Sequence, residues 1–85
     1  MERSLLDDVA EGAILLDGFD DCILGISEQF GEDVRVVYSK EKILDKLSEE
    51  MTVEEAVEFY EFNILGGYFG EQNPIFLSIG GHPHI

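Results

Sequence analysis

Apolar and polar residues alternate along two neighbouring segments of the chain, residues 22–30 and 34–38. The positions that share one face are Cys22, Leu24, Ile26 and Phe30 in the first segment, and Val34, Val36 and Tyr38 in the second. Alternation with a period of two residues is typical of half-buried β-strands. Because a short turn at residues 31–33 joins the two segments, the sequence predicts an antiparallel β-hairpin.

The spacing of apolar residues becomes helical after the hairpin. Ser39 is a favourable N-cap residue for a helix that we expect to run to about Glu49. Its apolar stripe consists of Ile43, Leu44 and Leu47. Such a stripe indicates the face of a helix that packs against the rest of the domain.

A second helix is predicted from residue 53 to about residue 65. Thr52 followed by Glu55 forms the capping-box pattern that begins a helix, and Gly66 with Gly67 is typical of a helix end. The side chains expected on its buried face are Val53, Ala56, Val57, Tyr60 and Ile64.

The remaining segments show weaker patterns. Residues 4–11 have helical spacing, whereas residues 13–16 are a short apolar run that fits either a strand or a continued helix. The structure of residues 1–16 therefore stays open. Pro74 precedes a final predicted strand at residues 75–79, and residues 80–85 are expected to form a flexible tail.

A single domain that spans residues 1–85 is expected, because the chain contains no internal repeat and no linker-like stretch. The predicted elements follow one another in the order β-β-α-α-β. Since strands and helices do not alternate, the sequence predicts an α+β fold. In it a small antiparallel sheet, made of the hairpin and the C-terminal strand, packs on two helices.

The composition is that of a globular protein that does not itself bind nucleic acid. The chain has 85 residues, of which 45% are apolar, and its formal net charge is −14. Phosphate contacts need clustered lysine and arginine side chains, so this charge excludes direct nucleic-acid binding. No apolar run approaches the roughly 20 residues of a membrane span, and the first residues show no signal-peptide pattern.

Cysteine content and size add two expectations. A single cysteine, Cys22, cannot form an internal disulfide, which favours a reducing compartment and a cytoplasmic location. A small domain has little buried surface, and repulsion among its many carboxylates opposes the compact state. We therefore expect a second chain to add stability, in a homodimer.

Charge is distributed unevenly along the chain. All 5 lysine and arginine residues precede Leu47, whereas glutamates continue after it. Glu54, Glu58 and Glu61 recur about one helical turn apart, and like charges at such spacing destabilise a helix by a few tenths of a kcal/mol, roughly. One interpretation is a solvated surface that keeps the protein soluble, a second is a surface that binds a basic partner, and a third is cation binding by the carboxylates. The candidate partner-binding residues are Glu49, Glu50, Glu54, Glu55, Glu58 and Glu61.

No arrangement of side chains indicates catalysis, so we expect neither an enzyme nor a bound cofactor or metal. Cys22 lies on the apolar face of a predicted strand and fits a buried core thiol. The only histidines, His82 and His84, lie in the predicted tail. The aspartates between residues 17 and 21 lack the ligand spacing of a calcium loop.

Aromatic side chains near the end of the second helix are more numerous than one buried face can hold. Phe59 and Phe62 lie off the predicted apolar stripe, and Tyr68 and Phe69 follow soon after. Packing from a second side of the helix accounts for them, and so does a dimer interface, where aromatic residues are enriched. The candidate self-interface consists of Phe62, Tyr68 and Phe69.

Phe19-Asp20-Asp21, followed by Gly25, opens a pattern that continues through residues 54–63 and closes near Pro74. The pattern, FDDA..G and then EEAxEYFEFNxxGAYxGExTPxF, resembles that of a group of short uncharacterised proteins of tailed bacteriophages. The resemblance covers about residues 17–77, which is most of the chain.

The resemblance implies a virus-encoded or prophage-encoded accessory protein that acts in the host cytoplasm. It also implies a shared polar site formed by Asp20, Asp21, Asn63 and Glu71, although Asn63 fits local capping of the helix end equally well. The chain departs from the group's pattern at Cys22 and Gly67, which replace alanine, and at Gln72 and Asn73.

Three hypotheses for function follow. In the first, the chain is a small acidic accessory protein that binds and inhibits a basic host protein of the defence or transcription machinery by nucleic-acid mimicry. In the second, it is a homo-oligomeric structural or regulatory module without enzymatic activity. In the third, Asp20, Asp21 and Glu71 bind a small ligand or a metal ion. None of the three involves a membrane or direct contact with nucleic acid.

Overall fold

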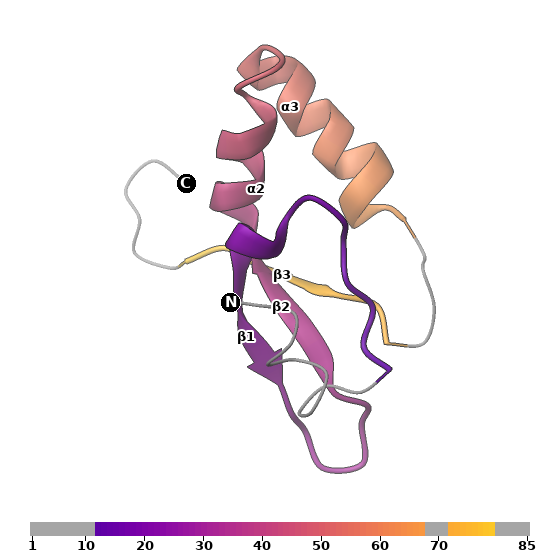
Figure 1. Cartoon of the computed structure of the whole chain (residues 1–85). Helices are drawn as coiled ribbons and strands as arrows, with labels where there is room; N and C mark the ends of the chain where they lie inside the picture. The colour runs from indigo at the N-terminus through magenta and orange to yellow at the C-terminus, as the bar shows by residue number, and fades with distance from the viewer. Residues whose placement is uncertain (1–11, 68–71, 80–85) are drawn as a thin grey trace.

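The computed structural model describes residues 12–67 and 72–79 (Figure 1). In these residues the chain forms a three-stranded sheet with strand order β1-β2-β3. A short 3-10 helix precedes β1, and the other helices lie between β2 and β3 in the sequence. The order β-β-α-α-β and the α+β fold are therefore confirmed. The elements are η1 (Asp20–Cys22, a 3-10 helix), β1 (Ile23–Ser27), β2 (Arg35–Ser39), α2 (Lys40–Leu47), α3 (Val53–Phe59), η2 (Tyr60–Leu65, a π-helix) and β3 (Ile75–Leu77).

The predicted hairpin is confirmed, but its first strand is shorter and its buried face is different. β1 and β2 pair antiparallel, with Ile23 opposite Tyr38 and Gly25 opposite Val37, so Leu24 is an extra residue in a β-bulge. A bulge breaks the alternation of the two faces. Leu24 is consequently exposed, against the prediction, while Ile23 is buried.

The two ends of the predicted first strand also differ from the prediction. Cys22 is buried as expected, but it belongs to η1. Phe30 lies in the turn beyond β1 and is fully exposed, so its assignment to a buried strand face is wrong. The predicted alternation in β2 is confirmed, since Val36 and Tyr38 are both fully buried.

The prediction of an entirely antiparallel sheet is wrong, because the sheet is mixed. β3 pairs with β2 in parallel, with Tyr38 beside Phe76 and Ser39 beside Leu77. Parallel neighbours need a long crossover connection, usually a helical one. Here α2, α3 and η2 form that connection, and they return the chain to the end of the sheet where β2 begins (Figure 1).

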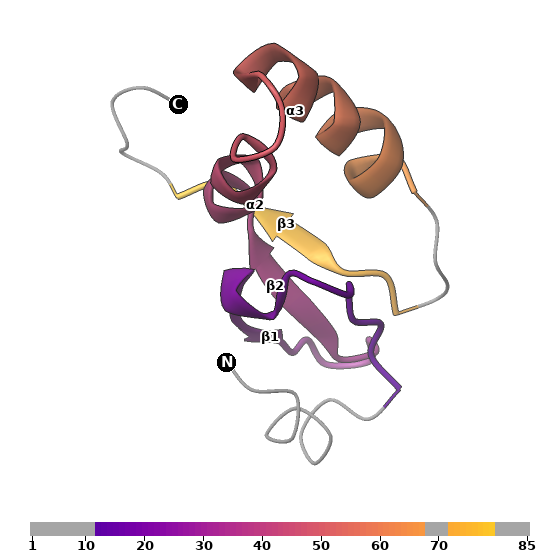
Figure 2. The ribbon, with the colours of Figure 1, turned by 45° about the horizontal axis from the view of Figure 1, so that its top comes forward.

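Aromatic rings join the helices to the sheet. The Tyr38 and Phe76 rings, on adjacent strands, stack with a centroid distance of 6.0 Å. The Tyr60 ring of η2 contacts Phe76 edge-on at 5.7 Å. η2 therefore packs over one face of the sheet through Tyr60, while α3 lies against α2 (Figure 2).

Residues 13–16, for which strand and helix were both open, form neither. The backbone N–H of Leu16 donates a hydrogen bond to the Tyr38 hydroxyl at 2.7 Å. Ala13 and Leu15 also pack against the core. This irregular segment therefore shares the covered face of the sheet with the helices (Figure 2). The predicted helix at residues 4–11 and the predicted tail at residues 80–85 lie outside the described residues.

The first predicted helix is confirmed as α2, which ends at Leu47, two residues before the expected end. The Ser39 hydroxyl accepts a hydrogen bond from the backbone N–H of Lys42, as an N-cap residue should. Of the apolar stripe, Ile43 and Leu47 are buried and Leu44 is half-buried. The stripe therefore marks the packed face of α2.

The second predicted helix is confirmed between residues 53 and 65, but its last turn and part of its buried face were not foreseen. Ala56, Tyr60 and Ile64 are buried as expected, whereas Val53 and Val57 are exposed. The buried residues recur at four-residue intervals. The helix thus contacts the core along a narrow line of residues, and Val53 and Val57 lie beside this line, where they are exposed to solvent.

The helix ends in a π turn that depends on a close backbone approach at Gly66. The N–H of Gly66 donates to the carbonyl of Glu61 at 2.9 Å, which is the five-residue spacing of a π-helix. A Cβ atom at Gly66 would lie 2.8 Å from that carbonyl oxygen. Glycine is therefore required there for space, since its φ of −78° is ordinary for any residue.

Candidate interaction surface

The six predicted partner-binding glutamates lie close to one another along the chain and are all exposed. Glu49 and Glu50 lie in the turn between α2 and α3, and the other four lie on α3 and η2. We use the name acidic helix surface for Glu54, Glu58 and Glu61 together with Glu49 and Glu50. The structure thus places on one exposed stretch the residues that the sequence grouped.

Most of these carboxylates are unpaired in the part of the chain that the structure describes. Within residues 12–67 and 72–79, Glu50, Glu54, Glu58 and Glu61 form no salt bridge and no side-chain hydrogen bond. Lysine side chains of this part of the chain have other contacts: Lys46 pairs with Asp21 at 2.9 Å, and Lys40 lies 5.6 Å from the centre of the Tyr60 ring. Within the described residues, the carboxylates of Glu54, Glu58 and Glu61 therefore carry negative charge that no salt bridge neutralises.

Glu55 is different, because the fold uses its carboxylate. The backbone N–H and the hydroxyl of Thr52 both donate to Glu55 Oε1, at 3.1 and 3.0 Å, and the Glu55 N–H donates to Thr52 Oγ1. This is the predicted capping box, now confirmed. The hydrogen bonds from Thr52 hold the pKa of Glu55 below its usual value. Glu55 is thus first of all a capping residue of α3.

The capping box makes a pH-dependent contribution to stability. Thr52→Ala is expected to cost about 1 kcal/mol near neutral pH, which is typical for loss of an N-cap. Because the pKa of Glu55 is lowered in the folded state, its contribution is present above the unfolded pKa and is lost as the pH falls through the folded pKa. Urea denaturation of both proteins between about pH 7 and pH 3 should show their difference shrinking in acid. A difference that stays constant over this range would contradict the capping role of Glu55, and Thr52→Ser should behave as wild type.

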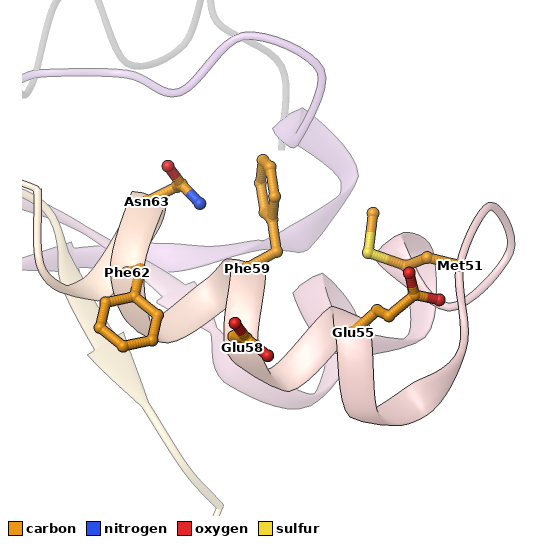
Figure 3. Close-up of a pocket in the computed structure, with 6 residues that line it drawn as sticks. All are labelled: Met51, Glu55, Glu58, Phe59, Phe62 and Asn63. Carbon is orange, nitrogen blue, oxygen red and sulfur yellow. The ribbon is translucent and has the colours of Figure 1, made fainter.

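A groove of about 430 Å³ lies beside the acidic helix surface. Figure 3 shows the side chains that line it, which come from α3, η2 and the turn before them. Phe62 is 74% exposed and Phe59 is 41% exposed. Contiguous exposed apolar patches mark interaction sites, and aromatic residues are enriched at interfaces. The lining residues are Met51, Glu55, Glu58, Phe59, Phe62 and Asn63.

Sequence reasoning found part of this groove and missed the rest. It named Glu55, Glu58, Phe62 and Asn63 as candidate site residues. It also placed Phe59 off the buried stripe, which was a signal that the ring is available for contacts. Met51 carried no such signal, since its part in the groove depends on the turn between α2 and α3.

The predicted polar site of Asp20, Asp21, Asn63 and Glu71 stays a prediction. Asp20 and Asp21 lie in η1, where the ammonium of Lys46 lowers the pKa of the Asp21 carboxyl through a hydrogen bond. Asn63 lies on η2 and lines the groove. Glu71 lies outside the described residues, so a site that includes it is not tested.

Other candidate chemistry finds little support in the part of the chain that the structure describes. No group of three or more His, Cys, Asp or Glu side chains there is arranged to hold a metal ion. Burial raises the pKa of the Cys22 thiol, which disfavours the reactive thiolate at neutral pH. Of the predicted self-interface, Phe62 is exposed, whereas Tyr68 and Phe69, like His82 and His84, lie outside the described residues.

Comparisons of the chain with protein families, with curated proteins and with solved structures give no match. No helix among residues 12–67 and 72–79 has the length and apolar character to cross a membrane.

Proposed function

We propose that this chain is a non-enzymatic binding protein whose acidic helix surface occupies the nucleic-acid-binding surface of a basic partner protein. The observation that carries the proposal is the set of exposed carboxylates on α3 and η2 that lack cationic neighbours among the described residues. Carboxylates one helical turn apart are separated by about 5 Å, comparable to the spacing of charges along a nucleic-acid strand. The surface therefore offers the partner a row of charges in place of phosphates.

The overall charge supports this mode of binding. A net charge of −14 attracts a basic protein over a distance of about one Debye length and speeds the encounter. Repulsion between like surfaces also opposes self-association through the acidic helix surface. The charge thus favours a partner of opposite sign over a second copy at this surface.

The resemblance in sequence supports a setting for the proposal. We propose that the chain is a phage-encoded accessory protein, and that its partner belongs to the defence or transcription machinery in the cytoplasm of a bacterial host. Such a partner has a basic surface shaped for phosphates, which is the surface that a row of carboxylates fits.

Affinity capture tests the partner class. The tagged chain is incubated with a bacterial lysate at low and then moderate salt, and the eluted proteins are identified by mass spectrometry. We expect a nucleic-acid-binding protein that is released by added salt and by added DNA or RNA. Recovery of an acidic partner, or of one whose binding resists both treatments, would contradict the proposal.

A second candidate function is a homo-oligomeric module, which the exposure of the Phe62 ring favours. In this case the molecular mass in solution should rise with protein concentration, and Phe62→Ala should abolish the rise. A constant monomer mass would exclude this candidate without affecting the first.

A further inference from the structure

The groove beside α3 combines exposed phenyl rings with the carboxylate of Glu58, which has no salt bridge or side-chain hydrogen bond within the described residues. In Figure 3 the Phe59 ring and Asn63 extend to one side of the helix, and the Phe62 ring and the Glu58 carboxylate lie toward the other. All four residues line the groove. Glu58 and Phe62 are one helical turn apart, so a single group can touch both. The geometry points to a site for an arginine side chain of the partner.

This inference rests on the proposed function and names the side chain that its surface recognises. A guanidinium group is planar and weakly hydrated, and it stacks on aromatic rings while donating two hydrogen bonds to one carboxylate. The rings of Phe59 and Phe62 supply stacking surfaces, and Glu58 supplies the acceptor. An ammonium group is compact and strongly hydrated, so lysine would use the charge of Glu58 but gain less from the rings.

Glu58 is the acceptor in this arrangement because its neighbour is already engaged. Glu55 Oε1 accepts two hydrogen bonds from Thr52, whereas Glu58 forms none within the described residues. Removing a lone carboxylate from water without a partner is costly. An entirely apolar occupant would impose that cost on Glu58, and a second copy of this chain would add its own negative charge. A cationic side chain avoids both.

The backbone of η2 positions two of the residues that line the groove. Phe62 and Asn63 belong to the π turn, and π turns occur often at functional sites because they are otherwise unfavourable. Val53 and Val57 on the same helix are also exposed, but at about 100° per residue they lie on the side of the helix away from the groove.

Titration with two short peptides tests the inference. The peptides share one sequence, except that every basic residue is arginine in one and lysine in the other. Binding to the full chain is followed by NMR chemical shifts at low ionic strength. We expect the arginine peptide to bind about two- to fivefold more tightly, with the largest shifts at Glu58, Phe59 and Phe62. Phe62→Ala should reduce the difference, because it weakens arginine-peptide binding more than lysine-peptide binding, and Glu58→Gln should weaken both.

Phe30→Ala is the matched control, because Phe30 is an exposed ring near Glu28 and Glu32 that stands in a turn without a second ring. It should leave the preference for arginine intact. Equal affinity for both peptides would overturn the arginine site and leave the acidic helix surface as a general electrostatic contact. Failure of both peptides to bind at low salt would overturn the proposed function as well.

Discussion

Replacing both Glu58 and Glu61 by lysine is expected to weaken binding to the basic partner by roughly tenfold or more, while the fold is retained. Both side chains are exposed and make no side-chain contact that the described structure needs. The substitution changes the local charge by about four units and places repulsive charges against the partner. Lysine near the C-terminal end of a helix is also favourable, so the melting temperature should stay equal or rise slightly. Calorimetric titration of the purified partner and a thermal melt measure the two effects.

The matched control reverses two other exposed glutamates, Glu28 and Glu32, near the β1–β2 turn. It changes the net charge of the chain by the same amount. If only net charge matters, the control variant will lose as much affinity as the variant with lysine at positions 58 and 61, and this result would contradict a defined binding surface. A small loss, confined to the association rate, is the outcome expected for charges outside the interface.

Ile43→Ala is expected to produce the largest loss of stability among the substitutions considered. Ile43 is fully buried in the core, where α2 meets the other elements. Truncation of a buried isoleucine to alanine costs about 2–5 kcal/mol, which is a large part of the roughly 5–15 kcal/mol that holds a small domain together. Urea denaturation should show a much lower midpoint for this variant or an unfolded protein at all concentrations.

Ile79→Ala provides the same chemical change at an exposed position, since Ile79 is 47% exposed. Its effect should stay within about 1 kcal/mol, because little buried surface is lost. If the two variants lose equal stability, the assignment of the core is wrong.

The parts of the fold that the sequence predicted correctly depend on local interactions. Ser39 and the pair Thr52–Glu55 bond to backbone groups within three residues, so their pattern alone identifies the starts of α2 and α3. The alternation that places Val36 and Tyr38 on one face likewise predicts a strand from local sequence alone, because every second side chain of a strand faces the core.

The parts that the sequence could not predict depend on contacts between distant segments. The direction of β3 follows from the path of the crossover and not from its own three residues. The bulge at Leu24 is visible only when β1 is aligned with β2. The exposure of Val53 and Val57 depends on how much of the helix surface packs against the core, and only the line of Ala56, Tyr60 and Ile64 does so.

The charged part of the candidate surface was predictable, because it also depends on local sequence. Unpaired glutamates on α3 follow from helical spacing and from the absence of basic residues after Leu47, so the sequence located the charge. The groove was not predictable, because it combines the turn at Met51 with the π turn at Phe62. No residue pattern in the chain predicts the π turn.

The central claim is that this chain and a nucleic acid compete for one surface of the partner. The most direct test is an equilibrium competition in which the purified partner is bound to a fluorescently labelled DNA or RNA and the chain is added at physiological salt. We predict that the label is released completely, with a midpoint that rises in proportion to the nucleic-acid concentration. A stable complex that contains partner, nucleic acid and chain together would contradict the claim.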